Sequence, residues 1–158
     1  MKIFKNTFIL FTLLVCLLSS CSDPLNNGMS SDDFHLTITI DGTEYITNNS
    51  RVSFAPDVVG GLYNITGTGL NNENSWITLN LASPTSEGTF TVQEPNVTLF
   101  YTTRSSVWGA SEQSGSGTIN ITKNTSEYME GTFSFTGSNP ADQTSREFIN
   151  GSFKAEKF

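Results

Sequence analysis

Apolar and polar residues alternate with a period of two along most of this chain, and this pattern constrains the fold more than any other feature. Leu36, Ile38 and Ile40 alternate with Thr37 and Thr39, and the same alternation recurs at 77–81, 118–122 and 132–136. Successive side chains of a strand point to opposite faces, so each run predicts a half-buried β-strand. No window of a dozen residues has a convincing helical period.

Turn-forming residues separate these runs. Clusters of Gly, Asn, Asp, Ser and Pro occur at 41–42, 60–61, 71–74, 115–117 and 139–140. Short strands between close turns predict an all-β domain, an antiparallel meander of about nine or ten strands. We expect it to be closed or nearly closed into a lipocalin-like barrel, with a two-sheet β-sandwich as the alternative. Gly131 and Gly151 lie inside longer runs, where they predict bends that curl the sheet.

The first 20 residues have the form of a signal peptide. Lys2 and Lys5 precede a mostly apolar run of eleven residues at 8–18, shorter than the roughly 20 that a transmembrane helix needs. The segment Leu18-Ser19-Ser20-Cys21 resembles the lipobox of bacterial lipoproteins. That resemblance implies that Cys21 is acylated and becomes the mature N-terminus, which would anchor the protein to a membrane.

The chain after the signal divides into a tether and one domain. Residues 21–33 comprise Cys21 and a flexible acidic tether, and residues 34–158 form a single all-β domain. Ser31-Asp32-Asp33 resembles the acidic tag of surface-displayed Bacteroidota lipoproteins, although that tag usually follows the cysteine directly. We therefore expect an outer-membrane lipid anchor in a bacterial cell envelope, with surface exposure favoured over a periplasm-facing position.

The charge of the chain is acidic, with a formal net charge of −7. Removal of Lys2 and Lys5 with the signal leaves six basic residues against fifteen acidic ones, a net of about −9. Nucleic acid would be repelled, because no basic patch offsets this charge. The sequence therefore excludes a nucleic-acid partner.

Few residues of the mature chain are suited to catalysis. Cys16 is lost with the signal, Cys21 carries lipid, and His35 is the single histidine. Without further His or Cys residues, the common zinc sites and a cysteine nucleophile are ruled out, and a triad would depend on His35 beside the tether. We expect no catalytic residue, metal site or cofactor. A hydrolase that uses paired carboxylates is the less favoured alternative.

The best candidate for a ligand-binding surface is the segment 100–117. It brings Tyr101, Arg104 and Trp108 close in sequence, beside small flexible residues, and aromatic rings and guanidinium groups suit sugar or peptide ligands. Trp76 begins a strand on its polar face and is a second exposed-aromatic candidate. The alternative is that Trp108 closes the end of the core and Arg104 pairs with a surface carboxylate. This structural interpretation is the favoured one.

Three motifs give a family resemblance. They are Ser116-Gly117-Thr118-Ile119-Asn120-Ile121-Thr122-Lys123, Met129-Glu130-Gly131-Thr132-Phe133-Ser134-Phe135 and Ile149-Asn150-Gly151-Ser152-Phe153. Together with the first hairpin at 38–45, they resemble a family of small Bacteroidota lipoproteins of unknown function. The resemblance implies a fold and a location and supplies no catalytic residue.

The expected function is that of a non-enzymatic binding module held in the cell envelope by lipid. Its ligand would be a glycan, a peptide or a small apolar molecule. The alternative is a structural or accessory subunit that docks on another envelope protein, which predicts an exposed apolar patch around Trp76 or Trp108.

Overall fold

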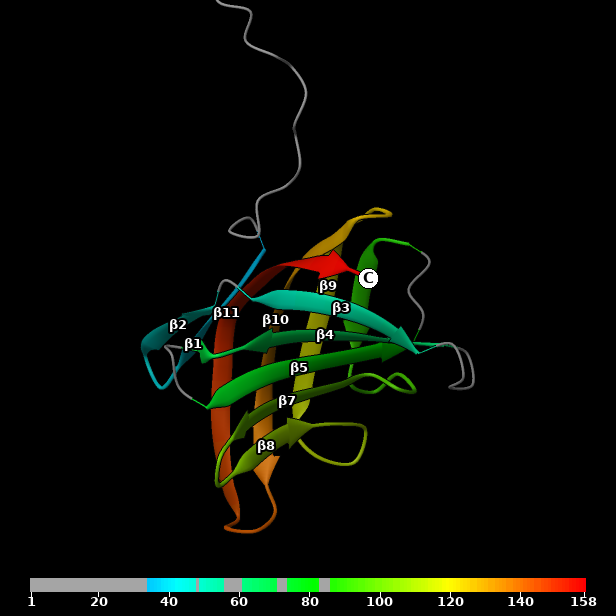
Figure 1. Ribbon diagram of the computed structural model, residues 1–158. Helices are drawn as coiled ribbons and strands as arrows, with labels where there is room; N and C mark the ends of the chain where they lie inside the picture. The colour runs from blue at the N-terminus through cyan, green and yellow to red at the C-terminus, as the bar shows by residue number, and fades with distance from the viewer. Residues whose placement is uncertain (1–33, 48, 56–60, 71–73, 83–85) are drawn as a thin grey trace, which may run out of the picture.

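The computed structural model describes residues 34–47, 49–55, 61–70, 74–82 and 86–158, and within them the protein is all-β (Figure 1). The eleven strands are β1 His35–Ile40, β2 Thr43–Thr47, β3 Ser50–Ala55, β4 Leu62–Thr68, β5 Ser75–Ala82, β6 Gly88–Thr91, β7 Thr98–Thr103, β8 Val107–Ala110, β9 Ser116–Asn124, β10 Tyr128–Asn139 and β11 Thr144–Lys157. The all-β prediction is confirmed. The expected signal peptide, Cys21 and the tether lie outside the described residues, and no helix within the described residues has the length and apolar character to span a membrane.

The strands form one sheet in the order β2-β1-β11-β3-β4-β5-β7-β8-β10-β9-β6, with a further pairing between β10 and β11. That pairing closes a ring of hydrogen bonds through β3, β4, β5, β7, β8, β10 and β11. In Figure 1, the strands β3, β4, β5, β7 and β8 cross in front of β9, β10 and β11, and β6 pairs with β9. The two layers are continuous, because β11 pairs with β3 and β10 pairs with β8. The two layers are therefore parts of one sheet, whereas the β-sandwich considered as the alternative has two separate sheets.

Two details differ from the predicted antiparallel meander of nine or ten strands. First, the structure has eleven strands, because β2, β6 and β8 are four or five residues long and too short for a clear alternation. Second, the sheet is mixed, because β11 and β3 run parallel through Glu156↔Arg51 and Lys157↔Val52. A parallel contact between segments a hundred residues apart has no local sequence signal.

The long strands β10 and β11 connect the two layers, through β8 and β3 respectively. Their mutual register shifts between Phe133 and Phe135, and Gly151 pairs with Phe133 at this irregularity. A Cβ atom on Gly151 would lie 2.7 Å from the Phe133 ring, so no larger residue fits there. The irregularity at Gly151, and another in the β9–β10 pairing at Gly131, lie where the sequence predicted bends.

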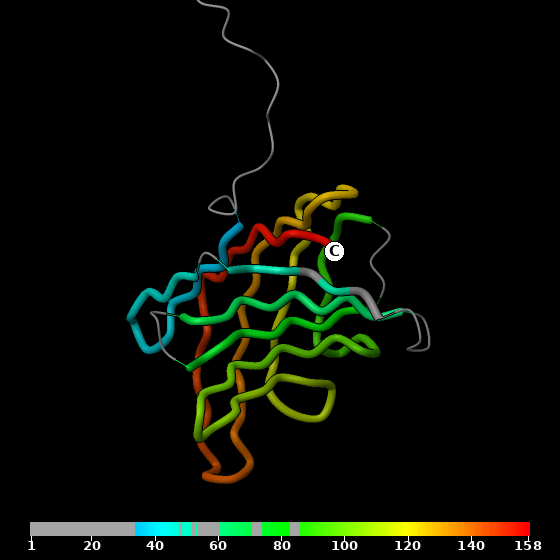
Figure 2. Tube along the Cα trace, in the orientation of Figure 1, coloured from blue at the N-terminus to red at the C-terminus, as the bar shows by residue number. Residues whose placement is uncertain are grey.

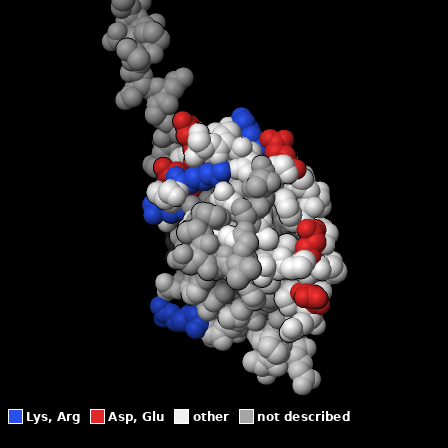
Figure 3. Space-filling view, turned by 90° about the vertical axis from the view of Figure 1, so that its right-hand side faces the viewer, with Lys and Arg blue, Asp and Glu red and all other residues white. Residues whose placement is uncertain are grey.

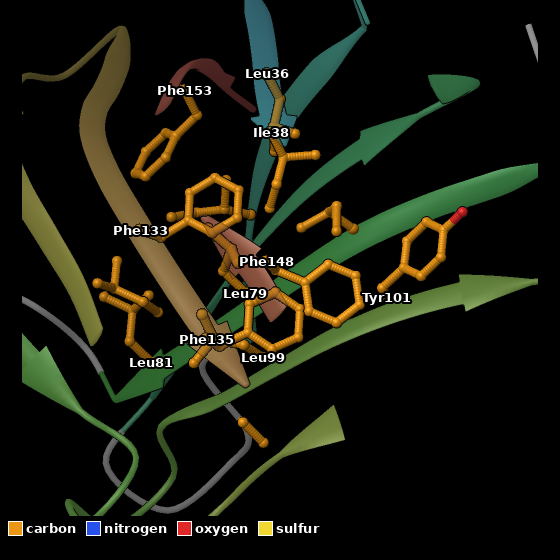
Figure 4. Packing of buried hydrophobic residues seen from close by; sticks show 14 of the residues in the cluster. Leu36, Ile38, Leu79, Leu81, Leu99, Tyr101, Phe133, Phe135, Phe148 and Phe153 are labelled. Atoms are coloured by element: carbon orange, nitrogen blue, oxygen red, sulfur yellow. The ribbon is translucent and has the colours of Figure 1, made fainter. Parts of the chain in front are cut away.

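The core lies between the two layers (Figure 4). The apolar residues of the alternating runs are buried, namely Leu36, Ile38, Ile40, Ile77, Leu79, Leu81, Ile119, Ile121, Phe133 and Phe135. Phe148 of β11 lies at the centre of the aromatic packing. Its ring stacks on Phe135 with centroids 4.1 Å apart, and the Tyr101 centroid lies 5.3 Å away.

Candidate binding cleft

Strand alternation sends Tyr101 and Trp108 into the core. Tyr101 of β7 and Trp108 of β8 are paired across the two strands. They are 4% and 6% exposed, and their rings stack with centroids 5.9 Å apart. The structure thus places both candidates where they pack against protein and offer no ring face to a ligand, as the structural interpretation of Trp108 predicts.

Trp108 closes the end of the core against β11. Its indole Nε1 donates a hydrogen bond to Oγ1 of Thr144 at 3.0 Å. The guanidinium of Arg146 lies over the Trp108 ring, with Cζ 4.2 Å from the centroid, and also pairs with Asp41 at 3.6 Å. These contacts fix β8 against the turn end of the β10–β11 hairpin.

Trp76 lies on the outer face of the sheet. It is 39% exposed and pairs with Thr102 of β7, which pairs in turn with Val107 of β8. Val107 is 44% exposed. The two apolar side chains therefore lie in one cross-strand row, separated by a threonine.

Arg104 is exposed in the turn between β7 and β8, and this turn is held by Thr103. The Thr103 hydroxyl accepts hydrogen bonds from the backbone N–H groups of Ser106 at 3.1 Å and Ser105 at 3.4 Å. The Thr103 N–H also donates to the Ser106 carbonyl at 2.9 Å. Such hydroxyl caps are a common way to fix a tight turn. The backbone of Arg104 is thus held in place, and its side chain projects from a well-defined turn.

Arg104 borders a cleft of about 820 Å³ between this turn and the β10–β11 hairpin. The lining residues are Phe100, Thr103, Arg104, Ser105, Ser106, Val107, Gly109, Ser111, Ser114, Ser138, Asn139, Pro140, Ala141 and Asp142. The Cα trace in Figure 2 shows the turn after β7 and the orange hairpin at the same end of the molecule. The blue start of β1 lies at the other end in the same view.

Phe100 forms the aromatic wall of the cleft. It pairs with Gly109 across β7 and β8, on the face opposite to Tyr101. A Cβ atom on Gly109 would lie 2.6 Å from Cε1 of Phe100, so the ring lies directly over the glycine. Phe100 was not among the candidates predicted from the sequence. The signal was available, because an inward Tyr101 requires an outward Phe100 in the same strand.

Asp142 is the single carboxylate among the described residues that line the cleft. Its Oδ1 accepts hydrogen bonds from the hydroxyl of Thr144 at 2.6 Å and from the N–H of Thr144 at 3.0 Å. These two bonds hold the pKa of Asp142 below its ordinary value of 3.8. Asp142 therefore stays charged near neutral pH and is occupied in shaping the hairpin.

The described residues outside the cleft supply no metal-binding cluster. On the face shown in Figure 3, basic and acidic side chains are scattered. Within the described ranges, no group of three or more His, Cys, Asp or Glu side chains is placed to hold a metal ion. His35 lies half-buried in β1, opposite Lys154 of β11.

Comparison with protein families gives one match. A family model described as a domain of unknown function (DUF6252) matches residues 33–155, which is nearly the whole of the expected domain. Neither the curated proteins nor the solved structures give a match. The match agrees with the expectation that the chain belongs to a family of unknown function.

Proposed function

We propose a function for this chain, which belongs to the DUF6252 family of domains of unknown function, from the geometry of its cleft. The protein is a non-enzymatic binding module of the bacterial cell envelope, and its ligand lies between the β7–β8 turn and the β10–β11 hairpin. The observation that carries this proposal is the cleft itself, about 820 Å³ in volume. Ligand sites in proteins are typically concave, about 300–1,000 Å³, with an apolar wall and a few polar groups.

The same cleft argues against the hydrolase alternative. Acid–base hydrolysis of glycosides needs two carboxyl groups across the scissile bond. The described lining holds only Asp142, and two hydrogen bonds from Thr144 occupy its Oδ1. Binding is therefore the better supported activity.

The location rests on the sequence. The lipobox-like segment that ends at Cys21 supports a lipid anchor in the outer membrane, and the acidic residues near Asp32 support display on the outer surface. The position of the cleft fits this arrangement. The β7–β8 turn and the β10–β11 hairpin, which line the cleft, lie at the end of the domain away from the blue start of β1 (Figure 1), so a tethered domain can present the cleft away from the membrane.

Two measurements test the proposal. Protease treatment of intact cells carrying an epitope-tagged protein should digest the domain, and Cys21→Ala should release the protein from the membrane fraction. Protection until the outer membrane is broken would contradict surface display, and membrane retention of Cys21→Ala would contradict the anchor.

Binding is tested with a variant that fills the cleft. Ser114 is exposed at the cleft margin, so Ser114→Trp should block the cleft and leave the fold intact. Calorimetric titration of the full chain in detergent with an oligosaccharide and peptide panel should detect at least one ligand that Ser114→Trp no longer binds. Equal binding by both proteins would exclude the cleft as the site.

A second candidate function is an accessory subunit of an envelope complex. The row formed by Trp76, Thr102 and Val107 favours it, because both apolar side chains are exposed and Val107 also lines the cleft. A photo-crosslinking residue in place of Trp76 tests this candidate in intact cells. A discrete crosslinked protein supports it, and the absence of any adduct counts against it.

A further inference from the structure

We infer that the ligand of this cleft is an acidic saccharide, whose carboxylate or sulfate group binds Arg104. This inference rests on the proposed binding function and specifies its ligand class. Three properties of the cleft support it: a guanidinium without a partner among the described residues, a set of open hydroxyl groups, and an aromatic wall.

Arg104 differs from the other basic side chains that the structure describes. Each of the others contacts a protein group: Arg51 lies over Phe158, Lys123 over Tyr128, Arg146 pairs with Asp41, Lys154 with Glu130, and Lys157 donates to Asn124. Within the described residues, Arg104 makes no ion pair, hydrogen bond or ring contact through its side chain. It is also the one cation that lines the cleft. Its charge is therefore available to a ligand.

The turn makes Arg104 suitable for binding an anion. Thr103 holds the backbone of the turn through the N–H groups of Ser105 and Ser106. A guanidinium presents five N–H donors in a planar fork, which matches the two oxygens of a carboxylate or sulfate. The other charged lining residue, Asp142, accepts hydrogen bonds from Thr144 and forms no ion pair with Arg104.

The remaining lining suits a sugar. Hydroxyl groups of Ser105, Ser111 and Ser114 line the cleft and have no hydrogen-bond partner among the described residues. A hydroxyl both donates and accepts, as the hydroxyl groups of a sugar do. Phe100 adds an apolar ring surface against which the C–H face of a sugar ring can pack.

A saccharide fits the cleft better than an acidic peptide. Extended peptides commonly bind by adding a strand to an open sheet edge. In this cleft, Ser138 of β10 already pairs with Gly109 of β8, and β7 is paired on both sides. A peptide strand would have to displace β10, whereas a sugar needs only the side chains.

Calorimetric titration of the full chain in detergent tests the inference. The probes are tetragalacturonate, a sulfated carrageenan tetrasaccharide, neutral maltotetraose and tetraglutamate. At least one acidic saccharide should bind about tenfold or more tightly than maltotetraose, the effect of about one charge-assisted hydrogen bond. The tighter of the two acidic saccharides identifies the anion as carboxylate or sulfate.

Variants locate the charge effect. Arg104→Gln should remove the preference for the acidic saccharide, and Arg104→Lys should restore part of it, because an ammonium keeps the charge without the planar fork. Arg51→Gln is the matched control, since it removes the same charge from β3 at a residue outside the cleft lining. It should leave binding unchanged.

The outcomes separate this inference from the proposed function. Equal binding of neutral and acidic saccharides, lost in Ser114→Trp, would overturn the inference and leave the binding function standing. Tighter binding of tetraglutamate than of either acidic saccharide would also overturn it in favour of an acidic peptide. Binding that persists unchanged in Ser114→Trp, or no binding by any probe, would overturn both.

Discussion

The indole Nε1 of Trp108 and the hydroxyl of Thr144 form a hydrogen bond of 3.0 Å between β8 and β11. The Thr144 hydroxyl then donates to Asp142 in the turn of the same β10–β11 hairpin. The Thr144 hydroxyl therefore hydrogen-bonds both to Trp108 at the end of the core and to Asp142 in a wall of the cleft. The stability of the fold and the shape of the binding site depend on each other at this point.

Thr144→Val should lower the free energy of unfolding by about 1 kcal/mol, because the nearly buried N–H of Trp108 loses its acceptor. Urea denaturation followed by circular dichroism measures the change. Thr122→Val is a matched control on an exposed position of β9 and should be close to neutral. An equal effect of the two substitutions would contradict the role of the Trp108 bond.

Asp142 should make stability depend on pH in the acid range. Its pKa is lower in the folded protein than its ordinary value of 3.8, because Thr144 donates two hydrogen bonds to the carboxylate. The stabilisation is therefore complete above pH 3.8 and is lost as the pH falls through the folded-state pKa.

Urea midpoints of the wild type and Asp142→Asn, measured from pH 6 to the lowest pH at which the protein folds, test this dependence. The asparagine keeps an acceptor and cannot ionise. The advantage of the wild type should be constant near neutrality and shrink in acid. Parallel curves over the whole range would be evidence against the hydrogen-bonded carboxylate.

Gly109→Ala should distort the aromatic wall of the cleft. The new methyl group would lie 2.6 Å from Cε1 of Phe100, so the ring must move. We expect a loss of ligand binding together with a drop in the melting temperature. In a Phe100→Ala background the same substitution should be nearly neutral, since the clash is gone, and a double-mutant cycle of melting temperatures measures the coupling. Additive effects would mean that the two residues act separately.

Phe148→Ala should destabilise the protein by about 3–5 kcal/mol, the usual cost of removing a fully buried phenylalanine ring. Phe148 contacts both Phe135 and Tyr101. Phe158→Ala removes a ring that is 75% exposed over Arg51 and should cost less than about 1 kcal/mol. Chemical denaturation of both variants gives the comparison, and similar losses would contradict the position of the core.

The local sequence pattern predicted which face of each strand is buried, but it did not predict every strand pairing. The alternation around Leu36, Leu79 and Ile119 marks the buried side of three strands, because the period of a strand depends only on its own backbone. The parallel contact of β11 with β3 joins residues 51 and 156, and no local pattern encodes such a pairing.

Only one wall of the candidate site was predicted, because local patterns do not show which distant segments meet. The sequence drew attention to 100–117, and Arg104 does border the cleft. The second wall comes from residues 138–142, which a sequence pattern does not bring near Arg104. Tyr101 was singled out in place of Phe100, although the inward position of Leu99 in the same strand assigns Tyr101 to the core.

The long strand β11 also has a mechanical consequence. The part of β11 from Phe148 to Lys154 runs antiparallel to β1, from His35↔Lys154 to Ile40↔Phe148. The first residue of β11, Thr144, lies at the hairpin turn beside the cleft. In the proposed arrangement, a ligand in the cleft pulls on the start of β11 while the lipid holds the start of β1. Two antiparallel strands pulled from these ends are loaded in shear, so their cross-strand hydrogen bonds must yield together rather than one by one. Single-molecule pulling between residues 34 and 144 should therefore require a higher force than pulling between residues 40 and 148, which face each other at one end of the β1–β11 pairing.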